Sequence, residues 1–250
     1  MRKQRLKSVP VITTDAATSG TQSNGDHKAP AAPRLEPTPV PHEFRPRDAD
    51  RSQKAILDAA KVEFAEHGLG GARVQRIAER APINKQLIYY YFKSKEHLFV
   101  AVLEDIYSEI REAEKQLALD QFEPVVAIRR LTEFTWQYYL DHPEMLTLIN
   151  SENLHRAKHL KKSKTIRERN SPLISMLGEV LERGRIEGTL RGGIDPLQLY
   201  ITITGLGYVY LSNNHTLSTI FGRNLMSPKA LNERLAHVLD VVMAYVVREP

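Results

Sequence analysis

The fold is decided by the stretch NKQLIYYYFKSKEHL at residues 84–98. Asn84 is a typical N-cap, and Ile88 and Phe92 follow at the four-residue spacing that places two apolar side chains on one face of a helix. Ser94 can cap a further helix that continues through Leu98. The stretch therefore predicts a short helix that ends near Phe92, a tight turn and then a long helix.

The preceding residues predict two more helices. Apolar residues recur at helical spacing from Ile56 to Phe64, and Gly68 can take the left-handed conformation that ends a helix. A second short helix is expected over 74–80, before Pro82 breaks it. Helix, glycine-containing turn, short helix, tight turn and short helix form the layout of a helix-turn-helix DNA-binding unit.

The third of these helices has an unusual polar face. Lys85 and Tyr89 are four residues apart, on a different face from Ile88 and Phe92, and Gln86 lies next to them. A cation, an amide and phenol hydroxyls can bond phosphates and base edges. A run of tyrosines in a helix usually serves packing. Its position directly after a capped turn favours DNA binding here.

The rest of the chain also predicts helices, so the fold class is all-α. No segment alternates with period two over a convincing length, and several expected helices begin with proline, which is tolerated in the first turn. The expected spans are 124–140, 143–159, 166–187, 196–213 and 228–248. The organisation that follows is a Pro-rich, basic tail over 1–48, a helix-turn-helix domain over 49–95 and a larger helical domain over 96–250.

Composition excludes several classes of protein. The 250 residues contain no cysteine, which rules out disulfides, thiolate metal sites and cysteine nucleophiles. No apolar run reaches the roughly 20 residues that span a membrane, and the N-terminus lacks the apolar stretch of a signal peptide. A net charge of +5 is compatible with nucleic-acid binding without proving it. We therefore expect a cytoplasmic protein.

The first 48 residues are expected to be disordered. They contain half of the chain's 14 prolines and few large apolar residues, so they cannot form a core. The basic residues between Arg2 and Lys7 could reach DNA as a flexible arm, but a solvated extension is the simpler interpretation.

Residues 51–103 resemble the DNA-binding domain of the TetR family of transcriptional regulators. The resemblance rests on Ile56-Leu57-Asp58-Ala59-Ala60 with Phe64 and Gly68, on Val74 with Ile77-Ala78, and on Lys85 through Tyr89-Tyr90-Tyr91-Phe92 to Lys93-Ser94-Lys95-Glu96-His97-Leu98. This long ordered combination is far more specific than a short motif. The chain departs from the pattern at Pro82, where glycine is usual, at Arg73, and at Gln86 and Leu87.

The resemblance implies roles for individual residues in DNA binding. Lys85 and Gln86 would probe base edges, and Leu87 would contact a thymine methyl group. The other implied contacts are to phosphates, although Arg76 could equally be a solvated arginine. The complete set of candidate DNA-binding residues is Arg73, Arg76, Asn84, Lys85, Gln86, Leu87, Tyr89, Tyr90, Tyr91 and Lys95.

The resemblance also implies a regulatory body with an effector pocket. Residues 166–196 are weakly similar to the subgroup of the pyrimidine-utilisation repressor, which favours an aromatic or nitrogen-heterocyclic catabolite as effector. Apolar walls with a few polar groups suit such a ligand. Some of the candidates could equally be core residues. The candidate ligand-binding residues are Trp136, Tyr139, Met145, Asn150, Glu152, Asn153, Tyr208 and Asn213.

In the family, two late helices usually form a dimer interface, and the candidates here are 166–187 and 196–213. The second is apolar nearly all round, which demands burial on more than one side, in a dimer or within one subunit. The expected function is a homodimeric repressor that binds a palindromic operator and is released by a small molecule.

No cofactor or metal is expected, and the chain is not expected to be an enzyme. His155 and His159 have the spacing of a metal pair, but Arg156 replaces the glutamate of a zincin motif and no third ligand suggests itself. The basic segment 155–164 is interpreted as a solvated helix end. The remaining alternatives are an enzyme or transport-related helical protein with an accidental helix-turn-helix, an activator, and an architectural protein that binds DNA without sequence preference.

Overall fold

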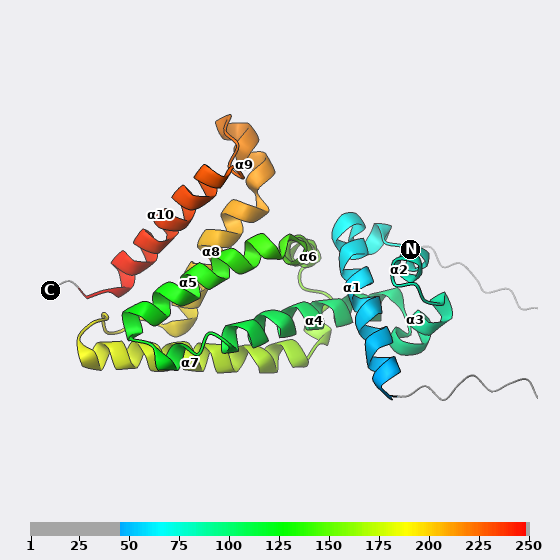
Figure 1. Cartoon of the computed structure of the whole chain (residues 1–250), viewed down its shortest axis with the longest axis horizontal. Helices are drawn as coiled ribbons and strands as arrows, with labels where there is room; N and C mark the ends of the chain where they lie inside the picture. The colour runs from blue at the N-terminus through cyan, green and yellow to red at the C-terminus, as the bar shows by residue number, and fades with distance from the viewer. Residues whose placement is uncertain (1–45, 249–250) are drawn as a thin grey trace, which may run out of the picture. The chain divides into compact units, whose positions relative to one another are not determined.

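A computed structural model of the chain describes residues 46–248, without the side chains of 46–47 and 167–171. The residues described form helices joined by short turns (Figure 1). The predicted tail lies almost wholly outside the described residues. The elements are α1 (Pro46–Gly71), α2 (Val74–Arg80), α3 (Lys85–Phe92), α4 (Lys95–Lys115), η1 (Leu119–Gln121), α5 (Pro124–Asp141), α6 (Pro143–Leu154), η2 (Leu160–Lys162), α7 (Thr165–Glu187), α8 (Pro196–Ser212), α9 (Asn214–Phe221) and α10 (Pro228–Val246).

The predicted caps begin α3 and α4. The Asn84 side chain accepts a hydrogen bond from the backbone N–H of Gln86, at 2.9 Å, and Ser94 Oγ accepts one from the N–H of His97, at 3.1 Å. Each bond satisfies an N–H that has no partner inside its helix. These two caps fix where the recognition helix α3 begins and where the long helix α4 takes over.

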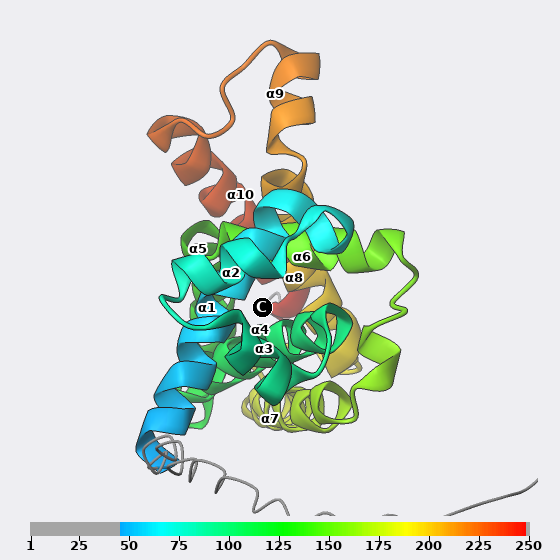
Figure 2. The ribbon, with the colours of Figure 1, turned by 90° about the vertical axis from the view of Figure 1, so that its right-hand side faces the viewer.

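Helices α1, α2 and α3 pack into one unit at one end of α4, and Figure 2 shows this unit nearest the viewer. Ile56, Phe64, Ile77 and Ile88 are buried at its centre, as the spacing predicts, and Phe92 is half-buried. Burial of such side chains stabilises each of them by roughly 1.5–3 kcal/mol relative to exposure. The reader, as we call residues 46–94, is therefore held by an apolar core.

The remaining helices form the body, as we call residues 95–248. Helix α7 packs along α4, while α5 packs against α8 and α10 (Figure 1). The apolar stripe of α4 that includes Val102, Ile106 and Ile110 is buried, as expected for a helix with one face toward the core.

Reader and body share a continuous core where they meet. Helix α1 packs against both α4 and α6. The rings of Phe64 in α1 and Phe99 in α4 are 5.1 Å apart in an edge-to-face arrangement. The ring of His159, which follows α6, lies 5.2 Å from Phe99. The predicted boundary between 95 and 96 thus falls inside packed structure, and the division into two domains stays a prediction.

Some helix bounds differ from the predicted spans. Helix α1 begins at Pro46, ahead of the apolar repeat at 56–64. Helix α6 ends at Leu154 because Arg156 and Ala157 adopt left-handed φ angles of 57° and 55°, so the predicted end near 159 was wrong. The segment after 213, where no helix was predicted, forms α9.

Two further features complete the described part of the chain. None of its helices combines the length and the apolar character that crossing a membrane would require. An isolated antiparallel bridge joins Leu190 to Val247 and ties the turn after α7 to the end of α10.

Candidate nucleic-acid interface and ligand cavity

The outer face of α3 is exposed. Tyr89 is 45% exposed and Tyr90 is 77% exposed, while the neighbouring Ile88, which faces the core, is 2% exposed. Lys85 is exposed as well, and its Nζ lies 6.0 Å from the centre of the Tyr89 ring. A tyrosine that is three-quarters exposed contributes little to folding. This face therefore presents a cationic group and two phenolic rings to solvent.

Helix α2 is locked to α1 by a buried carboxylate. Glu63 is fully buried, and its Oε1 accepts hydrogen bonds from Arg76 Nε, at 2.7 Å, and from the backbone N–H of Arg73, at 2.9 Å. Arg76 also donates to the carbonyl of Gly71. Burial alone would raise the pKa of Glu63, but these bonds outweigh it and lower that pKa. The lock fixes the turn that orients α2 and α3.

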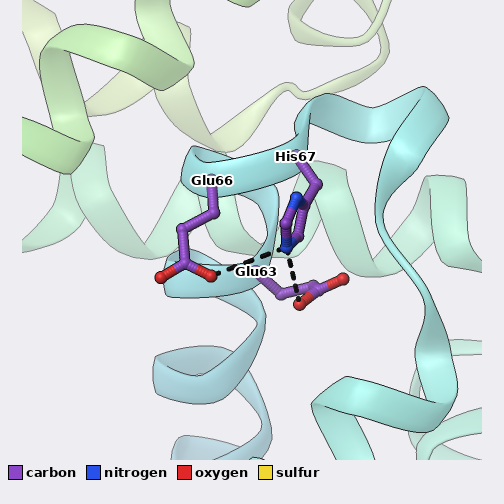
Figure 3. Close-up of side chains that lie close together, drawn as sticks. All are labelled: Glu63, Glu66 and His67. Atoms are coloured by element: carbon purple, nitrogen blue, oxygen red, sulfur yellow. Dashed lines mark ion pairs between the residues drawn. The ribbon is translucent and has the colours of Figure 1, made fainter.

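Figure 3 shows the other side of this carboxylate, at the end of α1. His67 Nε2 lies 3.8 Å from Glu63 Oε2 and 3.7 Å from Glu66 Oε2. A carboxylate pair with a histidine is a ligand set that metals use. The charges are already balanced, however, because Arg76 pairs with Glu63 and Arg80 with Glu66.

In a second group of carboxylates, a cation of the protein again balances the negative charges. Asp58, Asp105 and Glu109 come together between α1 and α4. Lys54 Nζ is within 3.2 Å of an oxygen of each of them, so an ammonium group occupies the centre of the cluster. The cluster is an ion-pair network that holds the reader to the body.

The body contains a cavity of about 460 Å³. Aromatic, aliphatic and a few polar side chains from α4, α5, α6, α7 and α8 form its wall, which is the usual character of a small-molecule site. The lining residues are Tyr107, Arg111, Tyr139, Met145, Ile149, Asn153, Ile174, Leu197, Tyr200, Ile201, Thr204, Gly205 and Tyr208.

Arg111 provides the cavity with a buried cationic group. Its side chain is only 10% exposed, one guanidinium nitrogen donates to Tyr200 Oη at 2.6 Å, and another lies 2.9 Å from Glu114. Glu114 is 1% exposed. Burial raises the pKa of Glu114 to about 7, although Arg111 opposes the shift. A larger hollow of about 730 Å³ between α4 and α7 is lined by both residues, so Arg111 separates the two spaces.

Helix α6 connects the cavity to the reader. Its residues Met145 and Asn153 line the cavity. The neighbouring Glu152 is buried and accepts hydrogen bonds from the backbone N–H groups of His159 and Leu160, and His159 Nδ1 lies 2.8 Å from its Oε2. The ring of His159 then packs on Phe99, next to the core of the reader. A continuous series of contacts, through Glu152, His159 and Phe99, thus joins the cavity wall on α6 to the core of the reader.

Comparison with known proteins identifies the family. The profile of bacterial regulatory proteins of the tetR family matches residues 56–102, and that of tetracyclin repressor-like C-terminal domains matches residues 124–242. The transcriptional repressor NicS of Pseudomonas putida is 38% identical over 199 residues, which is 80% of this chain and 94% of NicS. The chain belongs to the TetR family.

Other relatives agree with this assignment. The transcriptional regulator RutR of Escherichia coli K12 is 28% identical over 80% of this chain and 92% of RutR, in line with the predicted subgroup likeness. A solved structure of a TetR-family regulator from Mesorhizobium loti, 18% identical, has a TM-score of 0.62 and covers 80% of this chain and 98% of that one. The fold is thus TetR-like, and the chain is a helix-turn-helix transcriptional regulator rather than an enzyme.

Within this TetR fold, more than half of the residues predicted to bind DNA are exposed. Leu87, Tyr91 and Lys95 are half-buried and the side chain of Arg76 is occupied by Glu63. Lys95 Nζ donates to the carbonyl of Ala72 at 3.0 Å, so it also holds the turn before α2. The exposed members of the set are Arg73, Asn84, Lys85, Gln86, Tyr89 and Tyr90.

The predicted ligand-binding residues divide into two groups. Tyr139, Met145, Asn153 and Tyr208 line the cavity, and their role in ligand binding stays a prediction. The others do not line it. Trp136 is a core residue, 3% exposed, whose ring lies beside Gly207 of α8. Asn150 accepts a hydrogen bond from Tyr208, Glu152 holds His159, and Asn213 bonds the carbonyl of Val209 at the end of α8.

Sequence reasoning missed Arg111, the charged residue of the cavity, and its partner Glu114. Both lie in a helix rich in charges, where such residues usually face water. Their position one turn apart at the end of a buried apolar stripe, Ile106 and Ile110, is the signal that could have placed them inside.

Proposed function

We propose that the chain is a homodimeric repressor that binds a palindromic operator and is released from it by a small organic effector. The observation that carries this proposal is the exposed face of α3, which presents Lys85, Tyr89 and Tyr90 to solvent. The proposed division of labour is a DNA-binding unit over 49–95 and a ligand-binding and dimerisation unit over 96–250.

The mode of DNA binding that we propose follows from this face. Two copies of α3 would enter successive major grooves about 34–36 Å apart, which requires an approximate inverted repeat in the DNA. Lys85 and Gln86 would contact base edges, while Tyr89, Tyr90 and Arg73 would contact phosphates. Asn84 would support these contacts as the cap of α3.

The dimer surface that we propose includes the predicted helices 166–187 and 196–213. Leu197, Ile201 and Val209 of α8 are each about half exposed, at 48, 52 and 56%. Apolar side chains exposed to this degree on one helix favour a protein interface. Helix α10 adds Val241 and Tyr245, which are also exposed, so we extend the proposed surface to this helix.

The proposed release mechanism uses the cavity and α6. An effector that binds one of two conformations better shifts the population toward it. The contacts from Asn153 and Met145 through Glu152 and His159 to Phe99 would carry this shift to the reader. The resulting conformation would no longer match the spacing of the two half-sites.

The proposal is tested by selecting duplexes from a random pool with the full chain. We expect an enriched inverted repeat, bound with two chains per duplex, and measure affinity by fluorescence anisotropy with a labelled duplex. Lys85→Ala combined with Tyr89→Phe should weaken binding at least tenfold, because a base contact and a phosphate contact are lost. Lys95 is less suitable because it also holds the turn before α2.

The matched control is Lys229→Ala, which removes an exposed lysine of α10, far from α3 in sequence. It should leave affinity within about twofold, since it removes only a distant, screened charge. Equal losses in both variants, or an affinity that depends on salt but not on sequence, would instead indicate an architectural protein.

A further inference from the structure

Arg111, which lines the cavity, belongs to a buried ion pair with few hydrogen bonds. Among the residues that the structure describes, Arg111 Nε is buried without a hydrogen-bond partner, and the polar neighbours of the buried Glu114 carboxylate are Arg111, at 2.9 Å, and the Tyr200 hydroxyl. Buried polar groups in proteins are almost always hydrogen-bonded, and one that is not lowers the stability of the fold. An unpaired guanidinium N–H beside a cavity is therefore a binding position for an acceptor atom.

The partners of Arg111 indicate the chemistry of that acceptor. The guanidinium now faces a carboxylate, Glu114, and a phenol hydroxyl, Tyr200. Arginine binds carboxylates in a planar, two-bond geometry that is stronger than a bond to a neutral group. Burial raises the pKa of Glu114 to about 7, so near neutral pH this residue readily accepts a proton and releases Arg111.

The uncharged part of the cavity wall indicates what the rest of the ligand should be. The rings of Tyr107, Tyr139, Tyr200 and Tyr208 line the cavity together with aliphatic side chains such as Ile149. Aromatic walls favour a flat aromatic ring, which can stack or pack edge-on. A volume of about 460 Å³ accommodates one or two fused rings and excludes large ligands.

We infer that the effector is a small aromatic carboxylate, whose carboxylate replaces Glu114 as the partner of Arg111. This inference rests on the proposed function, because it names the ligand class of the proposed effector cavity. Glu114 then acts as an internal substitute for the ligand: it occupies Arg111 in the empty cavity and competes with the effector for it.

This competition predicts that removal of the Glu114 charge raises the affinity for the ligand. Glu114→Gln keeps the size of the side chain but removes the competing charge, so it should strengthen binding of benzoate and of 2-naphthoate at least threefold at pH 8. A residue with a purely structural role would weaken binding when replaced. Isothermal titration calorimetry on the full chain measures these affinities, and Glu112→Gln, an exposed carboxylate of the same helix, should change them less than twofold.

The importance of Arg111 is tested by a paired replacement. Arg111→Met alone leaves Glu114 buried without a cation and can prevent folding. Arg111→Met with Glu114→Gln removes both charges at similar volume, and circular dichroism checks that the variant folds. It should lose at least tenfold in affinity for both carboxylates.

The ligand class is tested with probes of matched shape. Benzoate should bind at least tenfold more tightly than benzamide or benzylamine, which carry no negative charge. Equal or tighter binding of benzamide or benzylamine would overturn the inference, as would the absence of benzoate and naphthoate binding or a weaker affinity in Glu114→Gln. Any of these results would leave the selection of an inverted repeat intact, whereas failure of that selection would count against the proposed function itself.

Discussion

Glu63 in the reader and Glu114 in the body are both buried beside an arginine, yet the pKa values of their carboxyl groups shift in opposite directions. Glu63 has a lowered pKa and Glu114 a pKa raised to about 7. Both lose contact with water, which favours the protonated acid in each case. The difference must therefore come from the hydrogen bonds that each carboxylate receives.

Glu63 receives two hydrogen bonds on one oxygen, from Arg76 and from the backbone N–H of Arg73. The polar neighbours of the Glu114 carboxylate are Arg111, at 2.9 Å, and the Tyr200 hydroxyl, with no backbone N–H among the described residues. A buried anion with good hydrogen bonds stabilises a fold, and one without them costs free energy. Glu63 is thus a structural lock. In the body, the pair of Arg111 and Glu114 leaves Arg111 Nε without a hydrogen-bond partner, and a ligand could bond to it.

The largest effect should follow from breaking the lock. Glu63→Gln should lower the free energy of unfolding by about 3 kcal/mol, because Arg76 loses its buried counterion. Urea denaturation followed by circular dichroism measures this change. Glu66→Gln is the matched control: that carboxylate is half exposed and paired with Arg80, so the loss should stay below about 1 kcal/mol. An equal loss of unfolding free energy in both variants would show that the buried Glu63 stabilises the fold no more than the exposed Glu66 does.

The two glutamates should also give opposite dependences of stability on pH. The lowered pKa of Glu63 stabilises the fold above pH 4.5, the ordinary value, and this contribution is lost as pH falls through the folded-state pKa. The raised pKa of Glu114 stabilises the fold below pH 4.5, and this contribution is lost as pH rises toward 7. Each therefore contributes in a different pH range.

Glu114→Gln isolates the second dependence. Between pH 5 and 7, the wild type should lose roughly 1 kcal/mol per pH unit relative to this variant, because only the wild type must release a proton into a buried site. Denaturation curves at several pH values measure the difference. A difference that stays constant with pH would show that Glu114 is ionised throughout and that its pair with Arg111 is as well satisfied as that of Glu63.

The smallest expected effect concerns Asn84, an exposed polar group of the reader. Asn84→Ala should cost about 1 kcal/mol of stability, since the cap of α3 is lost. Asn84→Asp keeps the cap but places a negative charge on the proposed DNA face, so it should weaken binding of the selected duplex without loss of stability. Denaturation and anisotropy together separate the two roles. Unchanged DNA affinity in Asn84→Asp would remove this position from the interface.

The sequence was sufficient to predict the reader because its signals are local. Caps at Asn84 and Ser94 and the spacing of Ile88 and Phe92 act within one or two helical turns, and α2 was predicted with its observed bounds. The bond from Arg76 to Glu63 joins residues of different helices. Arg76 was therefore considered a phosphate ligand, although the fold uses it as a lock.

The cavity was predicted only in part because it is assembled from five helices. Tyr139 and Tyr208, predicted to bind ligand, do line the cavity, since large aromatic residues with polar tips often line such sites. Arg111 carries the strongest polar chemistry of the cavity and pairs with Glu114, but in sequence both resemble the charges of a solvated face. The packing of α7 and α5 on α4 and the contact with Tyr200 of α8 remove them from water.

The buried position of Trp136 provides an optical reporter. It is the only tryptophan in the 250 residues, and it lies one turn before Tyr139, which lines the cavity. Both rings face Gly207 of α8, where an added Cβ would lie 3.7 Å from Trp136 and 3.4 Å from Tyr139. When the unlabelled protein is excited at a wavelength that tyrosine does not absorb, its fluorescence therefore originates from one indole beside the cavity wall, and a change in that emission would follow ligand entry in real time.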